Sequence, residues 1–396
     1  MGVMDWRRFS FEYRVRLDRL TSDLIRIEAS REAALNLVLP PDWKAQLDQL
    51  NRVRAVHGTT ALEGNPLSEA EVRQQMDLLA SEAVPPSTPS RDQRQVLNAG
   101  RAQDWIRQRF TPESPPLRRA DILQMHELIT EGSDETNNVP GRLRTHPVVV
   151  GAEALGGVHR GAPPQEVSSL VDRFVAFVNS RPFLANHPVV RALLAHFFLV
   201  TIHPFGDGNG RVSRLVEAGI PFQGEYNVFG FYGLSNYFYR HGDEYKRLLQ
   251  QSRRTQPFDL DAFVAFGVEG FAAELKGINN FIKTKLNRVV YRTTLVRAFN
   301  QRAGKRRRVI NQREYGLLDF LLQATEPIDP FADEPSRRIE YSELLQAPYV
   351  KEVYRNVTTR TFHRELIRLA ETGFIKFSVQ NREPTIEIDF EAIGKY

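Results

Sequence analysis

Apolar side chains recur at the spacing of amphipathic helices over most of the chain. Leu17, Leu20, Leu24 and Ile27 repeat every three or four residues, which predicts helical structure from about residue 5 to residue 82. A Pro/Ser-rich run at residues 84–90 interrupts this pattern and predicts a loop or linker. Beyond it, helices are predicted at residues 92–110, 119–129, 164–177, 188–202, 211–218, 243–251 and 260–297.

Two regions depart from the helical pattern. Val148, Val149 and Val150 are consecutive β-branched residues flanked by glycines, which predicts a short strand or hairpin. Near the C-terminus, two strand-like runs follow a set of helices, and that order is typical of a winged helix. The predicted elements there are helices at 312–323, 341–345 and 359–371 and strands at 374–379 and 385–390.

Composition narrows the class of protein. A length of 396 residues predicts two or three domains, and a formal net charge of +5 does not by itself imply nucleic acid. The chain has no cysteine, which excludes disulfides, thiolate metal sites and a cysteine nucleophile. The N-terminus lacks the pattern of a signal peptide, and the longest apolar stretch, residues 192–202, is too short to span a bilayer. We therefore expect a cytoplasmic protein without a membrane partner.

The segment 203–214, HPFGDGNGRVSR, has the backbone pattern of an anion site. Proline disfavours helix at the residue before it, so an apolar helix is expected to end at His203. Gly206, Gly208 and Gly210 allow a tight turn whose N–H groups approach a ligand closely. A new helix begins near Gly210, and its positive N-terminus favours a phosphate at the same place.

Four side chains of this segment add the chemistry of group transfer. Arg211 and Arg214 lie three residues apart and share a helix face, which suits a polyphosphate. Asp207 offers a hard oxygen ligand for Mg²⁺, an ion that bridges nucleotide phosphates. His203 can be neutral near pH 7 and can accept a hydroxyl proton. Together with the anion site, these groups predict phosphoryl-type transfer.

The same segment resembles the signature of the Fic family, HPF-x-[D/E]-GNGR-x-x-R, at every specified position. The resemblance implies a mainly α-helical Fic bundle over about residues 115–290. It implies attack of a Ser, Thr or Tyr hydroxyl of a target protein on the α-phosphorus of ATP, with Mg²⁺. Related phosphotransferases resemble ANKR at the position of residues 208–211, so GNGR favours nucleotidyl transfer. The resemblance implies that His203 is the base and that Asp207 is the metal ligand. Arg211 would bind the β-phosphate and Arg214 the γ-phosphate, while Phe205 would be an apolar anchor and Tyr245 an aromatic residue near the adenine. The turn that binds the phosphates would consist of Gly206, Gly208, Asn209 and Gly210.

An upstream segment resembles the inhibitory motif of the same family, [S/T]-x-x-x-E-[G/N]. It comprises Thr59, Glu63 and Gly64, and its place before residue 203 resembles the class with an N-terminal inhibitory helix. Glu63, next to a helix stop at Gly64, is expected to pair with Arg214 and to withhold that guanidinium from the γ-phosphate. In some relatives the matching glutamate also supports removal of AMP from the target, which is an alternative here.

Residues 141–150 resemble the Fic flap and its lead-in. The resemblance implies that Val148, Val149 and Val150 lie in a hairpin edge to which a target segment adds as a strand. His196, seven residues before His203, is expected to be a buried, hydrogen-bonded histidine rather than a metal ligand.

These features predict three domains: an N-terminal helical region with the inhibitory segment at 1–112, a Fic catalytic domain at 113–299 and a winged-helix-like domain at 300–396. The main interpretation is a self-inhibited protein adenylyltransferase whose protein target the sequence does not identify, and the chain itself is one candidate target. The alternatives are a winged-helix DNA-binding regulator with a nucleotide-responsive Fic scaffold and a Fic enzyme with another donor. Basic residues of helix 359–371 are the candidate DNA contacts, and a homodimer is a further candidate assembly.

Overall fold

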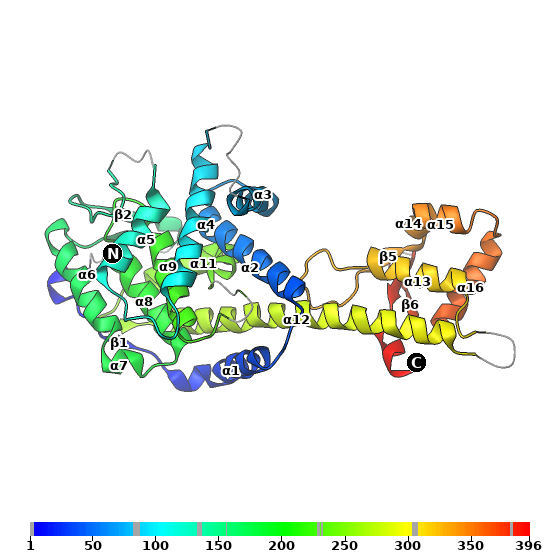
Figure 1. Ribbon diagram of the computed structural model, residues 1–396. Coiled ribbons are helices and arrows are strands. Elements are labelled where there is room, and N and C mark those ends of the chain that lie inside the picture. Colours follow the sequence, from blue (N-terminus) through cyan, green and yellow to red (C-terminus); the bar gives the residue numbers. More distant parts are fainter. Residues whose placement is uncertain are drawn as a thin grey trace. The chain divides into compact units, whose positions relative to one another are not determined.

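The computed structural model describes residues 4–81, 88–132, 137–155, 157–227, 230, 233–302, 308–380 and 383–396 (Figure 1). The chain divides into two compact units, Met1–Leu275 and Lys276–Tyr396. The boundary lies inside one helix, α12 (Asp261–Asn300), before residue 300, where the sequence predicts the third domain to begin. The three-domain division therefore stays a prediction. Residues 84–87 of the predicted linker at 84–90 fall outside the described residues, as do residues 305–307 of a run of four basic residues, Lys305 to Arg308.

The first unit is built from helices, as the sequence predicts. Each predicted helix beyond residue 90 is present, with ends that differ by a few residues. The helices are α1 (Thr21–Leu35), α2 (Pro41–Ala61), α3 (Glu69–Ala80), α4 (Arg91–Arg109), α5 (Arg119–Thr130), α6 (Pro164–Val178), α7 (Arg181–Leu184), α8 (Pro188–Ile202), α9 (Asn209–Gln223), α10 (Ser235–Arg240), α11 (Gly242–Ser252) and the first part of α12.

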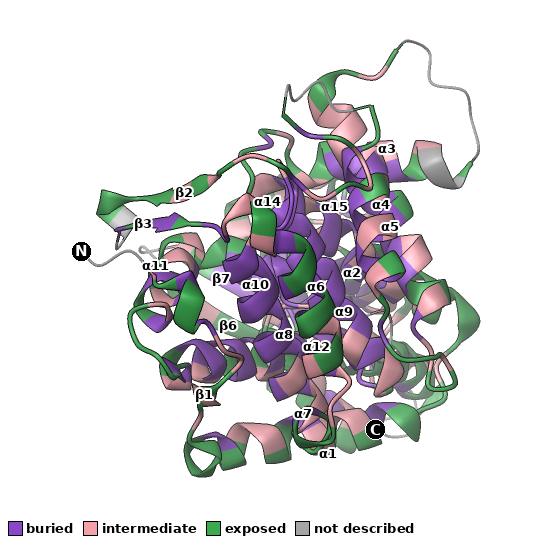
Figure 2. Ribbon diagram, turned by 90° about the vertical axis from the view of Figure 1, so that its left-hand side faces the viewer, coloured by how far each residue is buried: buried purple, intermediate pink, exposed green. Residues whose placement is uncertain are grey.

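Helix α8 is the centre of the first unit. Its residues from Val189 to Ile202 are buried almost without exception, which is the property of a helix packed on all sides. Helices α8 and α9 lie side by side (Figure 1), and Figure 2 shows the buried positions concentrated on them and on α10. This packing fixes the turn between α8 and α9, which contains residues 203–208.

Residues 4–20 differ from the helical expectation. They form two short 3-10 turns, η1 (Trp6–Arg8) and η2 (Leu17–Leu20), and a strand, β1 (Tyr13–Arg14). Strand β1 pairs in parallel with β4 (Phe258–Asp259), 245 positions later in the chain. Phe9 and Phe11 pack their rings against Phe198 of α8, with centroids 6.5 and 5.1 Å apart. Aromatic packing, rather than helix propensity, decides the path of this segment.

A two-stranded antiparallel sheet stands at the predicted hairpin. Strand β2 (Val149–Ala152) pairs with β3 (Gly157–Arg160), joined through a turn that contains η3 (Glu153–Leu155). Val148 precedes the strand and its carbonyl accepts a hydrogen bond from the N–H of Gly161, at 3.1 Å. Within the described residues, β2 has β3 as its only sheet neighbour, so its second edge is unpaired.

The second unit has a core of its own. The C-terminal part of α12 packs in one core with four helices and a three-stranded antiparallel sheet of order β5-β7-β6. Tyr291, Leu366 and Ile386 are fully buried there. The winged helix predicted here stays a prediction. The elements are α13 (Gln312–Ala324), β5 (Ile339–Glu340), α14 (Tyr341–Gln346), α15 (Pro348–Val353), α16 (Thr359–Glu371), β6 (Ile375–Gln380), β7 (Glu383–Ile388) and η5 (Phe390–Gly394).

Some charged residues of helix α16 form ion pairs within the unit, and others are exposed to solvent. Glu365 accepts a hydrogen bond from Arg313 at 2.6 Å, and Arg368 pairs with Glu314. Arg360 and Arg364 are exposed.

Among the helices of the described ranges, none has both the length and the apolar character that a bilayer span requires.

Candidate functional site

The site begins where α8 ends, at His203. The residue adopts a left-handed conformation, with φ 56° and ψ 61°, that is uncommon for a residue with a side chain. Proline at position 204 cannot continue the helix, and the chain turns away. Arg144 fixes this turn, because its Nε donates to the carbonyl of His203 at 2.7 Å and the Arg144 N–H donates to the carbonyl of Pro204 at 3.0 Å.

The loop after His203 is closed from within. The side chain of Asn209 accepts from the N–H of Phe205 at 2.8 Å and donates to its carbonyl at 2.9 Å. Phe205 is fully buried, and its ring stacks on that of His126 with centroids 3.8 Å apart. Phe205 thus lies beneath the loop, where an apolar anchor was predicted. Asn209, predicted to help hold phosphates, uses both polar atoms of its side chain to close the turn.

A second layer holds the loop from outside. The side-chain oxygen of Asn138 accepts from the N–H of Asp207 at 3.0 Å and lies 3.1 Å from Nε2 of His126. At Gly206 an added Cβ would lie 2.2 Å from the carbonyl oxygen of Asn137, so only glycine allows this close approach. The tight turn thus needs this glycine for packing as well as for backbone freedom.

Helix α9 begins directly after this loop and directs its N-terminus at the cavity. Gly208 stands at the N-cap with φ 76°, and no side chain caps the helix there. The first N–H groups of α9 lack intrahelical partners, and the helix dipole adds positive charge at the same end. Gly208, Asn209 and Gly210 line the cavity, and their binding of an anion there stays a prediction.

Arg211 and Asp207 form an ion pair within this motif. Their Nη2 and Oδ2 atoms are 2.6 Å apart. The guanidinium of Arg211 is almost fully buried, and its Nε has no hydrogen-bond partner among the described residues. The carboxylate of Asp207 remains 37% exposed and lines the cavity. This arrangement leaves oxygen atoms of Asp207 accessible to a ligand.

Arg214 is held by the predicted inhibitory segment at the end of α2. Its Nε donates to Oγ1 of Thr59 at 2.8 Å, and its Nη2 donates to the Thr59 carbonyl at 3.0 Å and to Oε1 of Glu63 at 2.7 Å. Gly64 follows with φ 88° after the helix has ended. The pair expected from the sequence therefore exists, and it joins residues 151 positions apart.

The carboxylate of Glu63 lies against the N-terminus of α9. A Cβ added at Gly210 would stand 2.3 Å from Oε1 of Glu63. Burial alone would raise the pKa of Glu63, but the guanidiniums of Arg214 and Arg211 offset it, and the pKa lies below its ordinary value. An ionised carboxylate thus lies at the anion-binding end of the helix, next to the guanidinium that pairs with it.

Tyr245 belongs to a buried relay behind Arg214. Its ring stacks on Phe238, and its hydroxyl lies 2.8 Å from Nε2 of His196. Nδ1 of His196 lies 2.6 Å from a carboxylate oxygen of Glu217, which can only accept, so Nδ1 carries the proton and Nε2 accepts from Tyr245. Burial raises the pKa of Tyr245 to about 12, although the guanidinium of Arg214 acts in the opposite direction. Tyr245 also lines the cavity, and its predicted position near an adenine stays a prediction.

His203 is neutral in this environment. Burial lowers its pKa to about 4, and the nearby guanidiniums of Arg253 and Arg144 act in the same direction. Nδ1 of His203 lies 3.2 Å from the carbonyl oxygen of Val200 and must donate to it. The proton therefore sits on Nδ1, which leaves the lone pair of Nε2 for a ligand.

One cavity of about 540 Å³ brings these groups together. His203, Asp207, Arg214 and Tyr245 line it, as does Glu63. Of the predicted flap residues, Val150 lines the cavity, whereas Val148 and Val149 lie on the same segment outside its lining.

Several residues of this site carry no signal in the sequence. His126 and Asn138 stand behind the loop, and Arg253 donates to Thr201 Oγ1 at 3.1 Å beside the base. Each is a single polar residue outside the 203–214 motif, brought to the site by helix packing. Arg144 lies in the flap lead-in, where only its buried position, 5% exposed, reveals its role.

The donor set fits one divalent cation shared with a polyphosphate. Groups of three or more His, Asp or Glu side chains suited to a metal do not occur among the described residues. Mg²⁺ is usually bound by one or two carboxylates together with substrate phosphates and water, and the half-exposed Asp207 at the anion site supplies such a ligand.

Part of this chain is similar to known proteins. Residues 116–218 match the sequence model of the Fic/DOC family. The chain is 29% identical over 164 residues to a protein adenylyltransferase Fic of Aedes aegypti, and 33% identical over 164 residues to protein adenylyltransferase fic-1 of Caenorhabditis elegans. Each match covers 41% of this chain, and 31% and 30% of the relative. The chain thus spans about a third of the length of these curated relatives.

Solved structures share the fold. A Fic family protein from Desulfovibrio desulfuricans G20 aligns with a TM-score of 0.55 at 17% identity, over 95% of this chain and 98% of that one. Residues 134–508 of Fic-1 from C. elegans align with a TM-score of 0.55 at 24% identity, over 68% and 74% of the two chains. The mainly helical fold predicted from the sequence is confirmed.

Proposed function

We propose, for a chain that contains a Fic domain at residues 116–218, that the protein is an adenylyltransferase that moves AMP from ATP to a Ser, Thr or Tyr hydroxyl of a protein. The observation that carries this proposal is the single cavity that unites a neutral His203, the N-terminus of α9 and the guanidinium of Arg214. Relatives named protein adenylyltransferase support the choice of AMP as the transferred group.

His203 acts as the base in this reaction. Its unprotonated Nε2 takes the proton of the target hydroxyl as the hydroxyl oxygen attacks the α-phosphorus. A new P–O bond forms, the bond from the α-phosphorus to the bridging oxygen breaks, and pyrophosphate leaves with the electron pair. The hydrogen bond from Nδ1 to Val200 holds the ring in the tautomer that this step needs.

The leaving pyrophosphate is stabilised by groups that already face the cavity. The N–H groups of Gly208, Asn209 and Gly210 receive phosphate oxygens, and Arg214 neutralises the terminal phosphate. Asp207, oriented by Arg211, would hold Mg²⁺. The ion would supply charge neutralisation between neighbouring phosphates.

Glu63 inhibits this reaction, in our proposal, by occupying the place of the terminal phosphate. Its carboxylate pairs with Arg214 and lies at Gly210, so an anionic group already occupies the site that the phosphate requires. ATP then binds without the Arg214 contact and in an unproductive position. Release of Glu63 makes the guanidinium of Arg214 available to ATP. Removal of AMP from a modified target is the alternative activity, and the Glu63 carboxylate is the group that would support it.

The target adds as a strand to the free edge of β2. Successive residues of a strand point their backbone N–H and C=O groups to opposite edges. The carbonyl of Val148 accepts a hydrogen bond from Gly161, on the side of β3, so the N–H of the next residue, Val149, points to the open edge. Val150, Gly151 and Ala152 border the cavity, which puts an added strand within reach of His203. Backbone pairing of this kind needs no particular target sequence.

The remaining sequence predictions form part of the proposal. The region 1–112 supplies inhibition, 113–299 catalysis and 300–396 a winged helix that recognises DNA or a protein. The exposed Arg360 and Arg364 are the residues on which DNA binding would depend. Gel-shift titration with duplex DNA, wild type against the double Arg→Gln variant, tests this part separately from catalysis.

Intact-mass spectrometry tests the proposed transfer. The Glu63→Gly variant, incubated with ATP and Mg²⁺ alone and with a cell extract, should yield protein species heavier by one AMP, together with free pyrophosphate. Pyrophosphate release without any modified protein, or a mass increase equal to phosphate, would rule the proposed reaction out.

A further inference from the structure

A second cavity, of about 200 Å³, lies in the first unit away from the transfer site. Its wall is mainly apolar: Phe110, Phe183 and Val216 line it and are almost fully buried. Val216 follows Arg214 on α9 by two residues, which is roughly 200° around the helix. The two cavities therefore use different faces of α9, and among the described residues they share no lining residue.

One charged side chain, Arg191 of α8, is among the described residues that line this cavity. Its Nε is buried without a hydrogen-bond partner, and in the described part of the chain no carboxylate pairs with it. Two ionisable groups interact with its charge, and neither is a carboxylate: the phenol of Tyr226, whose pKa is raised by burial and Glu28, and the imidazole of His187, whose pKa is lowered by burial. Burial lowers the pKa of Arg191, although a guanidinium remains charged at neutral pH.

An uncompensated cation next to an apolar wall is costly for a protein to retain. A half-buried charge loses hydration, and the loss is normally repaid by a partner carboxylate or by hydrogen bonds. Neither occurs at Arg191 among the residues that the structure describes, whereas other arginines of the unit, such as Arg109, form several such contacts. The described residues thus supply no partner for Arg191, which leaves that place to a ligand or to solvent.

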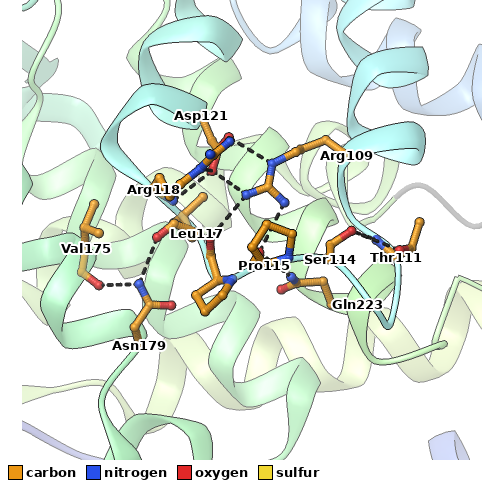
Figure 3. A network of polar contacts seen from close by, with 11 residues as sticks. Arg109, Thr111, Ser114, Pro115, Leu117, Arg118, Asp121, Val175, Asn179 and Gln223 are labelled. Atoms are coloured by element: carbon orange, nitrogen blue, oxygen red, sulfur yellow. Dashed lines mark hydrogen bonds and ion pairs between the residues drawn. The ribbon is translucent and has the colours of Figure 1, made fainter.

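The rim of the cavity is formed without a ligand. Figure 3 shows the segment that borders it: Arg109 donates to the carbonyl of Pro115 at 3.2 Å and pairs with Asp121 at 2.6 Å. Asn179 at the end of α6 donates to the carbonyl of Leu117 at 2.8 Å. These bonds hold both sides of the opening, so a ligand would meet a formed site and lose little free energy to ordering it.

We propose that this cavity binds a small, largely apolar carboxylate. Its ring or short chain packs on Phe110, Phe183 and Val216, and its carboxylate pairs with Arg191. The size is adequate, since an apolar cavity of about 150 Å³ in another protein accepts benzene. The inference concerns a site separate from nucleotide transfer and does not depend on that function.

Binding of benzoate to the full chain tests the proposal. Ligand-observed NMR and calorimetry would compare benzoate with the neutral benzamide and the cationic benzylammonium. A charge-assisted contact predicts that benzoate binds about tenfold or more tighter than benzamide, and that benzylammonium does not bind. In Arg191→Gln this preference for benzoate should disappear.

Two further variants make the result decisive. Ile220→Phe keeps Arg191 but fills the cavity from α9, and it should abolish binding of both benzoate and benzamide. Arg214→Gln, a matched arginine change in the other cavity, should leave benzoate affinity unchanged. Far-UV circular dichroism and thermal melts establish that each variant is folded. Saturable benzoate binding that persists in Arg191→Gln or Ile220→Phe, loss of binding in Arg214→Gln, or no benzoate binding by the wild type would overturn the proposal.

Discussion

The ion pair between Glu63 and Arg214 gives the most quantitative prediction. In Glu63→Gly the carboxylate that holds Arg214 is removed, while both bonds from Arg214 to Thr59 remain. The guanidinium then stays in place but becomes available to the terminal phosphate of ATP. We therefore expect a more active enzyme rather than a merely destabilised one.

The magnitude follows from the geometry of one contact. Nη2 of Arg214 and Oε1 of Glu63 are 2.7 Å apart, with Arg214 3% and Glu63 33% exposed. A hydrogen bond between charged groups contributes about 1.5–3 kcal/mol. Because solvent screens the exposed third of Glu63, we take about 2 kcal/mol, which corresponds to roughly a 30-fold change in an equilibrium. Glu63→Gln keeps a neutral hydrogen bond to Arg214, so its activation should be smaller.

The assay is the initial rate of AMP incorporation into protein at subsaturating ATP, with matched enzyme concentrations. Glu69→Gln, which removes an equal charge from the neighbouring helix α3, serves as the control and should behave as wild type. If Glu63→Gly stays within about threefold of wild type while it binds ATP, the Glu63–Arg214 pair does not limit the reaction, and the argument from its geometry is refuted.

Three further predictions concern the base and the flap, each measured in the Glu63→Gly background. Arg144→Met should lower kcat about tenfold or more with little change in ATP affinity, because Arg144 donates a hydrogen bond to the carbonyl of His203. An unchanged kcat in steady-state assays would contradict this prediction. Burial lowers the pKa of His203 to about 4, and loss of the Glu63 carboxylate lowers this pKa further. We therefore expect kcat/KM to stay constant as the pH falls from 7 to about 5.5. A decrease in kcat/KM centred near pH 6.5 would show that the pKa of the base is unperturbed. Val149→Pro removes an N–H that points to the open edge of β2, so it should lower the modification of protein targets at unchanged ATP affinity. Equal modification by this variant and by the Glu63→Gly protein without it would argue against strand addition.

How much of this site the sequence predicts depends on how its residues are distributed along the chain. Asp207, Arg211 and their neighbours lie within one turn and the start of one helix, so local rules place them correctly. The partnership of Glu63 with Arg214 spans 151 positions and was predicted only through the resemblance of its motif.

Other contacts depend on packing that no local pattern encodes. His126, Asn138 and Arg253 reach the site because α5 and α11 and their adjoining loops pack around α8 and α9. The strands β1 and β4 have two residues each, too few for a period-two pattern, and the long-range pairing between them defines them. Arg191 is similar: its residue type suggests an ordinary surface arginine, and only the tertiary structure reveals the cavity beside it.

The most direct test of the account follows which phosphate of ATP reaches the protein. The Glu63→Gly protein and the double variant Glu63→Gly/His203→Ala would be incubated, in parallel, with ATP labelled at the α-phosphate and with ATP labelled at the γ-phosphate. The account predicts protein-bound label from the α-phosphate alone, and its loss when His203 is replaced. Label from the γ-phosphate, or α-label that persists without His203, would contradict AMP transfer by this base.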